Sequence, residues 1–166
     1  MVIALDACCG FKNMWKGKDT SNVIFLDKRR EVKPTILADA RWLPFRDKVF
    51  DIIYCDPPHL IRSDAKSILT RSPKSVGAEY LRKFGWFNSR SEWIVFLYRV
   101  NREFKRCLKD DGKLWFKLVD GKDRRVTKLR DVEIYLDNFQ ITSKKVADAK
   151  AGWSTNKTIY LWMKKA

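Results

Sequence analysis

The sequence contains few of the residues that mark several large protein classes. Its four cysteines, Cys8, Cys9, Cys55 and Cys107, form no Cys-x-x-Cys pair, which argues against a structural zinc site or a disulfide framework. We expect reduced thiols packed as small apolar groups. No stretch approaches the roughly 20 apolar residues of a membrane span, and the first residues do not form a signal-peptide pattern. We therefore expect no membrane partner and a cytoplasmic location.

Glycine and histidine are also few, and acidic residues are outnumbered by basic ones. The 166 residues include 7 glycines and 1 histidine, with neither a Gly-x-Gly-x-x-Gly fingerprint nor a phosphate loop ending in Lys-Ser/Thr. These absences argue against that type of dinucleotide site and against ATP or GTP hydrolysis. Lys and Arg number 35 against 20 Asp and Glu, a net charge of +15. Such an excess indicates a polyanionic partner such as nucleic acid; a basic surface that only maintains solubility is the alternative.

Short apolar runs alternate with longer amphipathic stretches along the chain. This pattern predicts one α/β domain over residues 1–166, with a mostly parallel sheet and helices on both of its faces. The last two strands, joined by a loop containing Gly152, predict a C-terminal antiparallel β-hairpin. Strands are expected at 2–5, 22–26, 35–38, 50–55, 113–119, 139–146 and 158–163, and helices at 12–16, 92–108 and 125–138.

Four successive predicted strands end in an aspartate, at Asp6, Asp27, Asp39 and Asp56. Parallel strands bring their carboxyl ends to one edge of a sheet, where ligands of open α/β folds are bound. Asp27 follows Asp6 by 21 residues (27 − 6), the spacing of a carboxylate that holds ribose hydroxyls. Asp39 is placed to accept from an adenine amino group, and Gly10 lets the backbone approach a ligand closely. These positions predict an adenosine site.

The tetrapeptide Asp56-Pro57-Pro58-His59 follows the fourth strand. Two prolines cannot continue a strand, so the chain turns and presents a carboxylate, proline carbonyls and an imidazole. Hydrogen bonds from an aromatic amine to the Asp56 carboxylate and the Pro57 carbonyl would localise the amine lone pair and orient it. An aromatic ring at position 59 would stack on an unpaired base; imidazole can stack or accept a hydrogen bond.

Together these motifs resemble those of class I S-adenosylmethionine-dependent methyltransferases, which have a Rossmann-like fold. Asp6–Gly10, Asp27, Asp39 and the Asp56–His59 turn resemble the family's first four motifs. The Asp-Pro-Pro-aromatic form marks enzymes that methylate amino nitrogens, including adenine N6 and cytosine N4. The resemblance implies that S-adenosylmethionine is the cofactor and that Asp56, Pro57, Pro58 and His59 are catalytic. The implied cofactor-binding residues are Asp6, Ala7, Cys8, Gly10, Asp27, Asp39, Ala40 and Asp56.

The first loop with Trp15, the Asp56–Leu60 loop and the run 113–117 are similar to small methyltransferases of phage genomes, which would place the protein in a host cytoplasm. The chain departs from the family pattern at His59, where tyrosine or phenylalanine is usual. The first predicted strand begins at Val2, so contacts usually made by a preceding helix are expected to be absent or to come from a partner. There is no room for a large target-recognition domain, which a homodimer would be one way to offset.

Residues 61–90 are expected to form a basic, aromatic substrate-contact insertion or lid. This segment carries seven Lys or Arg against Asp64 and Glu79, a net of +5 (7 − 2), with aromatic residues interleaved. Cations beside aromatic rings hold phosphates and stack bases; in the alternative, the aromatics pack against the sheet while the charges face water. The predicted substrate-binding residues are Arg62, Lys66, Arg71, Arg82, Lys83 and Trp86.

The sequence favours DNA as the methyl acceptor. RNA is the nearest alternative, followed by a protein or small-molecule amine, and a basic nucleic-acid-binding module without turnover is a hypothesis of another class. Cys55 precedes Asp56 inside the apolar run, which does not suit a thiol nucleophile. The tryptophans are interpreted as core or edge packing residues rather than ligand platforms: Trp15, Trp42, Trp93, Trp115, Trp153 and Trp162.

Overall fold

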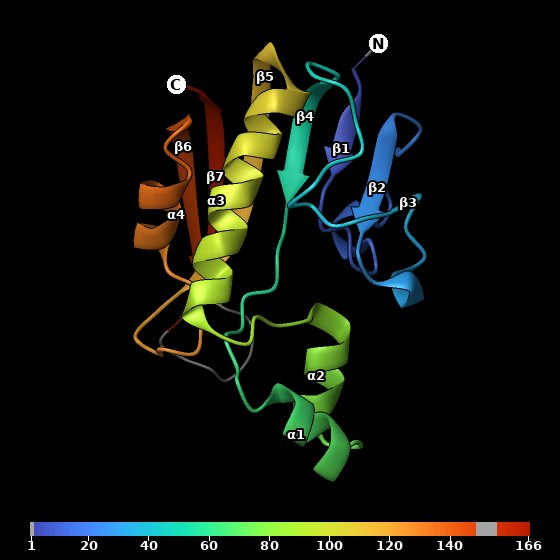
Figure 1. The fold of residues 1–166 in the computed structure, drawn as a ribbon, viewed down its shortest axis with the longest axis vertical. Coiled ribbons are helices and arrows are strands. Elements are labelled where there is room, and N and C mark those ends of the chain that lie inside the picture. Colours follow the sequence, from blue (N-terminus) through green and yellow to red (C-terminus); the bar gives the residue numbers. More distant parts are fainter. Residues whose placement is uncertain (1, 149–155) are drawn as a thin grey trace.

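A computed structural model describes residues 2–148 and 156–166. Seven strands form one sheet in the order β3-β2-β1-β4-β5-β7-β6 (Figure 1). Neighbours among the first five strands in this order are parallel, and β7 pairs antiparallel with both β5 and β6. The strands are β1 (Ala4–Asp6), β2 (Val23–Asp27), β3 (Ile36–Leu37), β4 (Phe50–Cys55), β5 (Leu108–Asp120), β6 (Phe139–Asp148) and β7 (Lys157–Lys165).

This architecture confirms the predicted α/β fold and its C-terminal hairpin. The parallel order reverses direction between β1 and β4, because the chain runs outward from β1 to β3 and then returns to pair β4 with the other side of β1. Such a reversal opens a crevice outside the carboxyl ends of the strands. Gly152 and Trp153, which the sequence placed in the hairpin loop and in packing, lie outside the described residues.

The helices α3 (Arg90–Cys107) and α4 (Leu129–Tyr135) cover one face of the sheet, and α3 crosses in front of the central strands in Figure 1. Ser89 begins α3 because its hydroxyl accepts a hydrogen bond from the Glu92 amide at 3.1 Å, a typical N-cap. Its buried stripe includes Trp93, Leu97, Val100 and Phe104, at the spacing of one helical face. These side chains form the core with Leu114, Phe116, Leu118, Leu161 and Met163 of the sheet.

The other face of the sheet carries much less helix. It includes η1 (Asn13–Trp15), a single 3-10 turn whose Trp15 ring packs against Phe25 and Tyr54. Helical elements thus occur on both faces, as predicted, but unequally. The predicted helix at 12–16 is a 3-10 turn, because only three residues lie between positive-φ Lys12 and the extended Lys16, and a longer α-helix cannot form there.

Several element boundaries differ from the predictions. The helix expected at 125–138 is confined to Leu129–Tyr135, and the turn η2 (Arg30–Val32) was not expected. β5 begins at Leu108 instead of 113, because Leu108 pairs with Phe50 before the register shifts to Lys113 opposite Ile52. The intervening residues form a bulge, so the expected break after α3 lies inside a strand.

The segment 61–90 contains two short helices, α1 (Ala65–Arg71) and α2 (Val76–Phe84), that the sequence left unassigned. Figure 1 shows them beyond the carboxyl end of β4, away from the body of the sheet. Isolated bridges between Ile61 and Phe87 and between Leu60 and Val126 tie the segment to the domain. No helix among the described residues is long and apolar enough to cross a membrane.

Candidate active site

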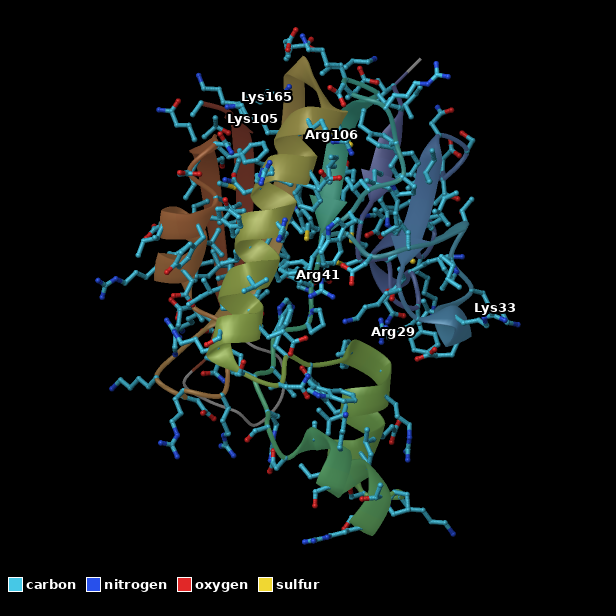
Figure 2. All side chains as sticks on the ribbon, in the orientation of Figure 1. Arg29, Lys33, Arg41, Lys105, Arg106 and Lys165 are labelled. Atoms are coloured by element: carbon cyan, nitrogen blue, oxygen red, sulfur yellow. The ribbon has the colours of Figure 1, made fainter. Side chains whose placement is uncertain are left out.

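The four predicted aspartates lie at the carboxyl edge of the parallel strands. Asp6 and Asp27 end β1 and β2, Asp56 follows β4, and Asp39 lies two residues beyond β3. Figure 2 shows Arg29 and Arg41 at this edge, toward α2, whereas Lys105, Arg106 and Lys165 lie at the opposite end of the sheet. The edge therefore combines the acidic rim predicted from the sequence with basic side chains that the motif analysis did not include.

Both carboxylate oxygens of Asp56 are held by cations or donors. Oδ2 accepts a hydrogen bond from Lys117 Nζ at 2.7 Å, and Oδ1 lies 3.0 Å from His59 Nε2. Burial alone would raise the pKa of Asp56, but His59 and Lys117 outweigh it and lower the pKa below its ordinary value. Asp56 is thus an ionised acceptor in a fixed orientation, with carboxylate lone pairs left for a substrate amine.

His59 is directed toward Asp56 instead of standing free as a stacking platform. Its side chain is only 11% exposed, and its backbone carbonyl accepts from the Thr127 amide at 3.0 Å. An ionised carboxylate can only accept, so the Nε2 atom facing Asp56 carries the proton of this pair. Nδ1 is buried without a hydrogen-bond partner, which makes His59 an oriented imidazole with one uncommitted nitrogen.

The turn residues Pro57 and Pro58 place backbone carbonyls beside this pair. No hydrogen bond to either carbonyl occurs within residues 2–148 and 156–166. Gly85, at the end of α2, has φ of 73°, and a Cβ there would lie 3.2 Å from Pro58 Cγ. Glycine at this position therefore lets the end of α2 approach the turn closely. The Asp56–His59 turn is packed against the lid segment.

Asp6 is buried, and its carboxyl group is hydrogen-bonded within the protein. Its Oδ2 accepts from Trp15 Nε1 at 2.7 Å, and its Oδ1 accepts a longer bond from the Cys8 amide at 3.4 Å. Burial, aided by the nearby Asp56 and Asp27 carboxylates, raises the pKa of Asp6 to about 7 despite the lowering effect of the two hydrogen bonds. The sequence predicted a cofactor contact here, and the structure shows that this carboxyl already anchors η1.

Asp27 holds the first loop and the end of the lid together. It accepts hydrogen bonds from the Gly10 amide at 2.9 Å and from Arg29, whose Nε lies 3.1 Å from Oδ1. The same Arg29 guanidinium donates to the carbonyls of Arg82 and Lys83, both at 3.3 Å. Gly10 has φ of 48°, so glycine suits this turn. Ribose hydroxyls at Asp27 would have to replace the Arg29 donors.

Asp39 has a matching arginine two residues later. Arg41 donates to both of its carboxylate oxygens, at 3.0 and 2.7 Å. Burial would raise the pKa of Asp39, but the Arg41 bonds and charge hold it below its ordinary value. Ala7 and Ala40 are buried beside the loops, and Cys8 is half-buried. All the predicted cofactor positions thus line the same edge of the sheet.

The predicted substrate-contact residues are dispersed over the lid segment. Arg62 pairs with Asp64 at 2.6 Å, and Arg82 donates to the Pro73 carbonyl at 2.7 Å, so both also stabilise the segment itself. Half-buried Trp86 donates to Asn88. Among the predicted substrate-binding residues, the exposed basic side chains are those of Lys66, Arg71, Arg82 and Lys83. Their substrate role stays a prediction.

Two residues of the site carried no functional prediction. Lys117 lies on β5 beside the turn. The sequence shows it as a cation that alternates with the apolar residues Phe116 and Leu118 in a central strand. Arg29 belongs to an Asp-x-Arg spacing that recurs at Asp39 and Arg41. The spacing is visible in the sequence, but spacing alone does not show which arginine forms a hydrogen-bonded ion pair with which carboxylate.

Cys55 does not present a nucleophile. It is fully buried, and burial raises the pKa of its thiol. Trp93 is fully buried, as expected of a packing residue, whereas Trp42 and Trp162 are 55% and 37% exposed. A hollow lined by Trp15, Ile52 and Tyr54 lies on the face of the sheet and not at its carboxyl edge.

Comparison with known proteins yields no matching family model and no matching curated sequence. Among solved structures, an S-adenosylmethionine-dependent methyltransferase from Methanosarcina mazei is 14% identical, with TM-score 0.58 over 98% of this chain and 92% of that one. PH0226 from Pyrococcus horikoshii is 19% identical, with TM-score 0.53 over 95% and 80%. The [4+2]-cyclase SpnF is 11% identical, with TM-score 0.59 over 99% and 75%.

These similarities define the class of structure: the chain has the class I S-adenosylmethionine-dependent methyltransferase fold. The cyclase among the similar structures shows that this fold also serves another reaction, so function rests on the site. Gly10, Asp27 and Asp39 all lie at the carboxyl edge of the parallel strands, where open α/β folds bind their ligands, so the site offers hydrogen-bonding groups that fit an adenosine-containing cofactor. A ribose at Asp27 would require Arg29 to move aside.

Proposed function

We propose that this protein transfers a methyl group from S-adenosylmethionine to an amino nitrogen, with the exocyclic amine of adenine or cytosine in DNA as acceptor. The observation that supports this most is the ionised Asp56 carboxylate, fixed by Lys117 at 2.7 Å and His59 at 3.0 Å beside unoccupied proline carbonyls. That arrangement offers hydrogen-bond acceptors for both N–H groups of one amine. The net charge of +15 supports a polyanionic acceptor.

Residues of the first loop and neighbouring strand ends would hold the cofactor. Asp27 would bind the ribose hydroxyls, Asp39 the adenine amino group, and Gly10 would keep the backbone close. When bound, S-adenosylmethionine supplies an electrophilic methyl group on sulfur. Asp6 would act indirectly, by holding η1 through Trp15.

The substrate amine would donate one N–H to Asp56 and the other to the Pro57 carbonyl. These bonds oppose delocalisation of the nitrogen lone pair into the ring and direct it for in-line attack. Lys117 stabilises the ionised state of Asp56 and restricts its rotation, so the acceptor is preorganised. His59 would use its uncommitted Nδ1 to take the proton that the methylated nitrogen releases.

A radiolabelled methyl-transfer screen tests the proposal. It compares single-stranded DNA, double-stranded DNA, RNA and protein as acceptors, and titration calorimetry with S-adenosylhomocysteine measures cofactor binding separately. We expect incorporation into DNA on an exocyclic amine. If the label entered only RNA or protein, that molecule would take the place of DNA as the proposed acceptor. If S-adenosylhomocysteine did not bind, the proposal of a methyltransferase would be refuted.

The Asp56→Asn variant tests the proposed chemistry, because it preserves shape while removing the negative charge. We expect methyl transfer to fall about a hundredfold or more, with S-adenosylhomocysteine binding retained. Asp111→Asn is the matched control, since Asp111 is exposed on β5. Full activity of Asp56→Asn would refute the assigned role. Nucleic-acid binding by wild type without transfer to any acceptor would favour a non-catalytic module.

A further inference from the structure

The face of the sheet opposite α3 carries a row of aromatic side chains in neighbouring strands. The register places Tyr54 of β4 beside Trp115 of β5, and Trp115 beside Trp162 of β7. Ring centroids are 5.7 Å apart for Tyr54 and Trp115, and Tyr160 lies 5.8 Å from Trp115. We call Tyr54, Trp115, Tyr160 and Trp162 the aromatic row.

No described helix covers this row. Trp162 is 37% exposed, and the other three side chains are half-buried. Two 3-10 turns lie on this side within residues 2–148 and 156–166: η2 packs through Val32 into the cluster with Phe25 of β2, and η1 reaches the Tyr54 end of the row through Trp15. Parallel sheets ordinarily have both faces covered. The aromatic row is therefore a partly exposed surface that no described helix covers, with Trp162 as its most exposed ring, and uncovered apolar surfaces of this kind mark binding sites.

Lysines border the aromatic row on two sides. Lys113 and Lys164 are register partners on one side, and both are exposed. Lys117 and Lys145 both align with Tyr160 on the other side. In the described part of the chain, Lys113, Lys145 and Lys164 form no ion pair. Exposed Asp111 is an acidic neighbour at the Lys113 end.

From this juxtaposition we propose that the aromatic row and its bordering lysines bind single-stranded nucleic acid. The bases would stack on the exposed rings while the lysines contact phosphates, which is how sequence-tolerant single-strand sites work. A duplex keeps its bases stacked on one another, so it would use the lysines but not the rings. A second copy docked by two-fold symmetry would bring lysine-bearing surfaces together, which charge repulsion opposes.

The surface is continuous with the candidate active site, and in this respect the inference rests on the proposed function. Tyr54 lies near the end of β4, two residues before Asp56, and Lys117 contacts Asp56 directly. A strand lying across the aromatic row would therefore reach the Asp56–His59 turn at the carboxyl edge. The surface would hold the chain while one base enters the site.

Fluorescence anisotropy with a labelled single-stranded oligodeoxynucleotide tests the surface without requiring catalysis. For Lys113→Gln/Lys164→Gln, we expect weaker binding and a log–log salt slope smaller by about 1.4, at about 0.7 per lost contact. Arg102→Gln/Arg130→Gln is the matched control, because those exposed arginines lie on α3 and α4 of the covered face. Equal losses in both double variants would overturn the proposal.

Stacking is tested by Trp162→Ala, with Tyr98→Ala as control; Tyr98 is 52% exposed on α3. We expect at least about fivefold weaker single-strand binding for Trp162→Ala, quenching of wild-type tryptophan fluorescence by the oligonucleotide, and little effect of Tyr98→Ala. The lysine variants keep the test decisive if Trp162→Ala does not fold. Equal affinity for a duplex would overturn the stacking role and favour general binding of nucleic acid. Equally tight binding of poly-glutamate would also overturn it and favour an interface for acidic proteins.

Binding and methyl transfer give separable outcomes. Single-strand binding that depends on the aromatic row, without methyl transfer to nucleic acid, would support the surface and refute the acceptor. Methyl transfer to DNA that is unchanged in all the surface variants would support the acceptor and refute the surface.

Discussion

His59 stands where the methyltransferases that this chain resembles usually have a tyrosine or phenylalanine ring for stacking on a base. Its Nε2 faces Asp56 at 3.0 Å and its Nδ1 is buried without a partner. An orphaned buried acceptor is costly, and a substrate proton would satisfy it. The residue identity was evident from the sequence, but the direction of each ring nitrogen required the packed turn.

We predict that His59→Gln lowers kcat by about a hundredfold, the usual contribution of general acid–base catalysis. The glutamine amide can still donate to Asp56 but has no imidazole nitrogen to take a proton. The measurement is kcat against pH for wild type, His59→Gln and His59→Phe. If His59→Phe retained full kcat and its pH dependence, a stacking role would replace the proton-transfer role.

A second residue-scale prediction concerns Asp6. Burial raises its folded-state pKa from 3.8 to about 7, so the folded protein binds a proton that the unfolded chain has already released. The contribution of protonated Asp6 to the free energy of unfolding is therefore fully present below pH 3.8 and is lost as the pH rises through about 7. At about 1.4 kcal/mol per pKa unit, the loss is up to about 4 kcal/mol.

Asp6→Asn should remove this pH dependence while keeping an acceptor for Trp15. Urea unfolding at pH 4.5 and pH 8 measures this dependence. Wild type should lose a few kcal/mol of unfolding free energy through Asp6 between the two pH values, and the variant should not have this loss. A constant difference between the two proteins at both pH values would contradict the raised pKa.

At the scale of elements, Arg29 connects the end of β2 to the end of α2. It donates to Asp27 and to the carbonyls of Arg82 and Lys83. The short helices α1 and α2 bury few side chains, namely Ala65, Ala78 and Leu81, so such tethers matter for their position. The sequence predicted a basic insertion or lid here, which stays a prediction, and it did not predict the two helices, because each is too short for a firm periodic signal.

Arg29→Ala should destabilise the free protein by about 1–3 kcal/mol, since it leaves the buried Asp27 carboxylate short of donors. Ribose hydroxyls would replace those donors, so S-adenosylhomocysteine should raise Tm more in this variant than in wild type. Differential scanning fluorimetry measures both effects, with Arg102→Ala as control. A smaller ligand-induced shift would instead place Arg29 among the groups that bind the cofactor.

At the scale of the whole molecule, the two faces of the sheet differ in how far helices cover them. Phe116 is fully buried beneath α3, whereas Trp162, on the neighbouring strand β7, is 37% exposed on the other face. Alternation along β5 produces this division, because Leu114, Phe116 and Leu118 point to the core while Lys113, Trp115 and Lys117 point away.

We predict that Phe116→Ala lowers the free energy of unfolding by about 3–5 kcal/mol, the cost of removing a buried phenylalanine. Trp162→Ala should cost less than half as much, because its side chain fills no enclosed core. Urea denaturation of both variants in the same buffer makes the comparison. Similar losses would mean that the aromatic face is structurally as important as the covered one.

The sequence by itself determined the alternation of strands and helices, the C-terminal hairpin and the aspartates at the strand ends. Each of these depends on local periodicity, turn chemistry or spacing, which neighbouring residues carry. The tertiary structure alone decided that Lys117 and His59 share Asp56, that Arg29 closes on Asp27, and that one face of the sheet exposes its aromatic rings. The Lys117–Asp56 contact joins residues 61 positions apart, and no local pattern specifies which of many charged side chains meets which partner. His59 and Arg29 are close to their aspartates in the chain, but the direction of each side chain depends on its packing against other elements, such as the end of α2 for Arg29.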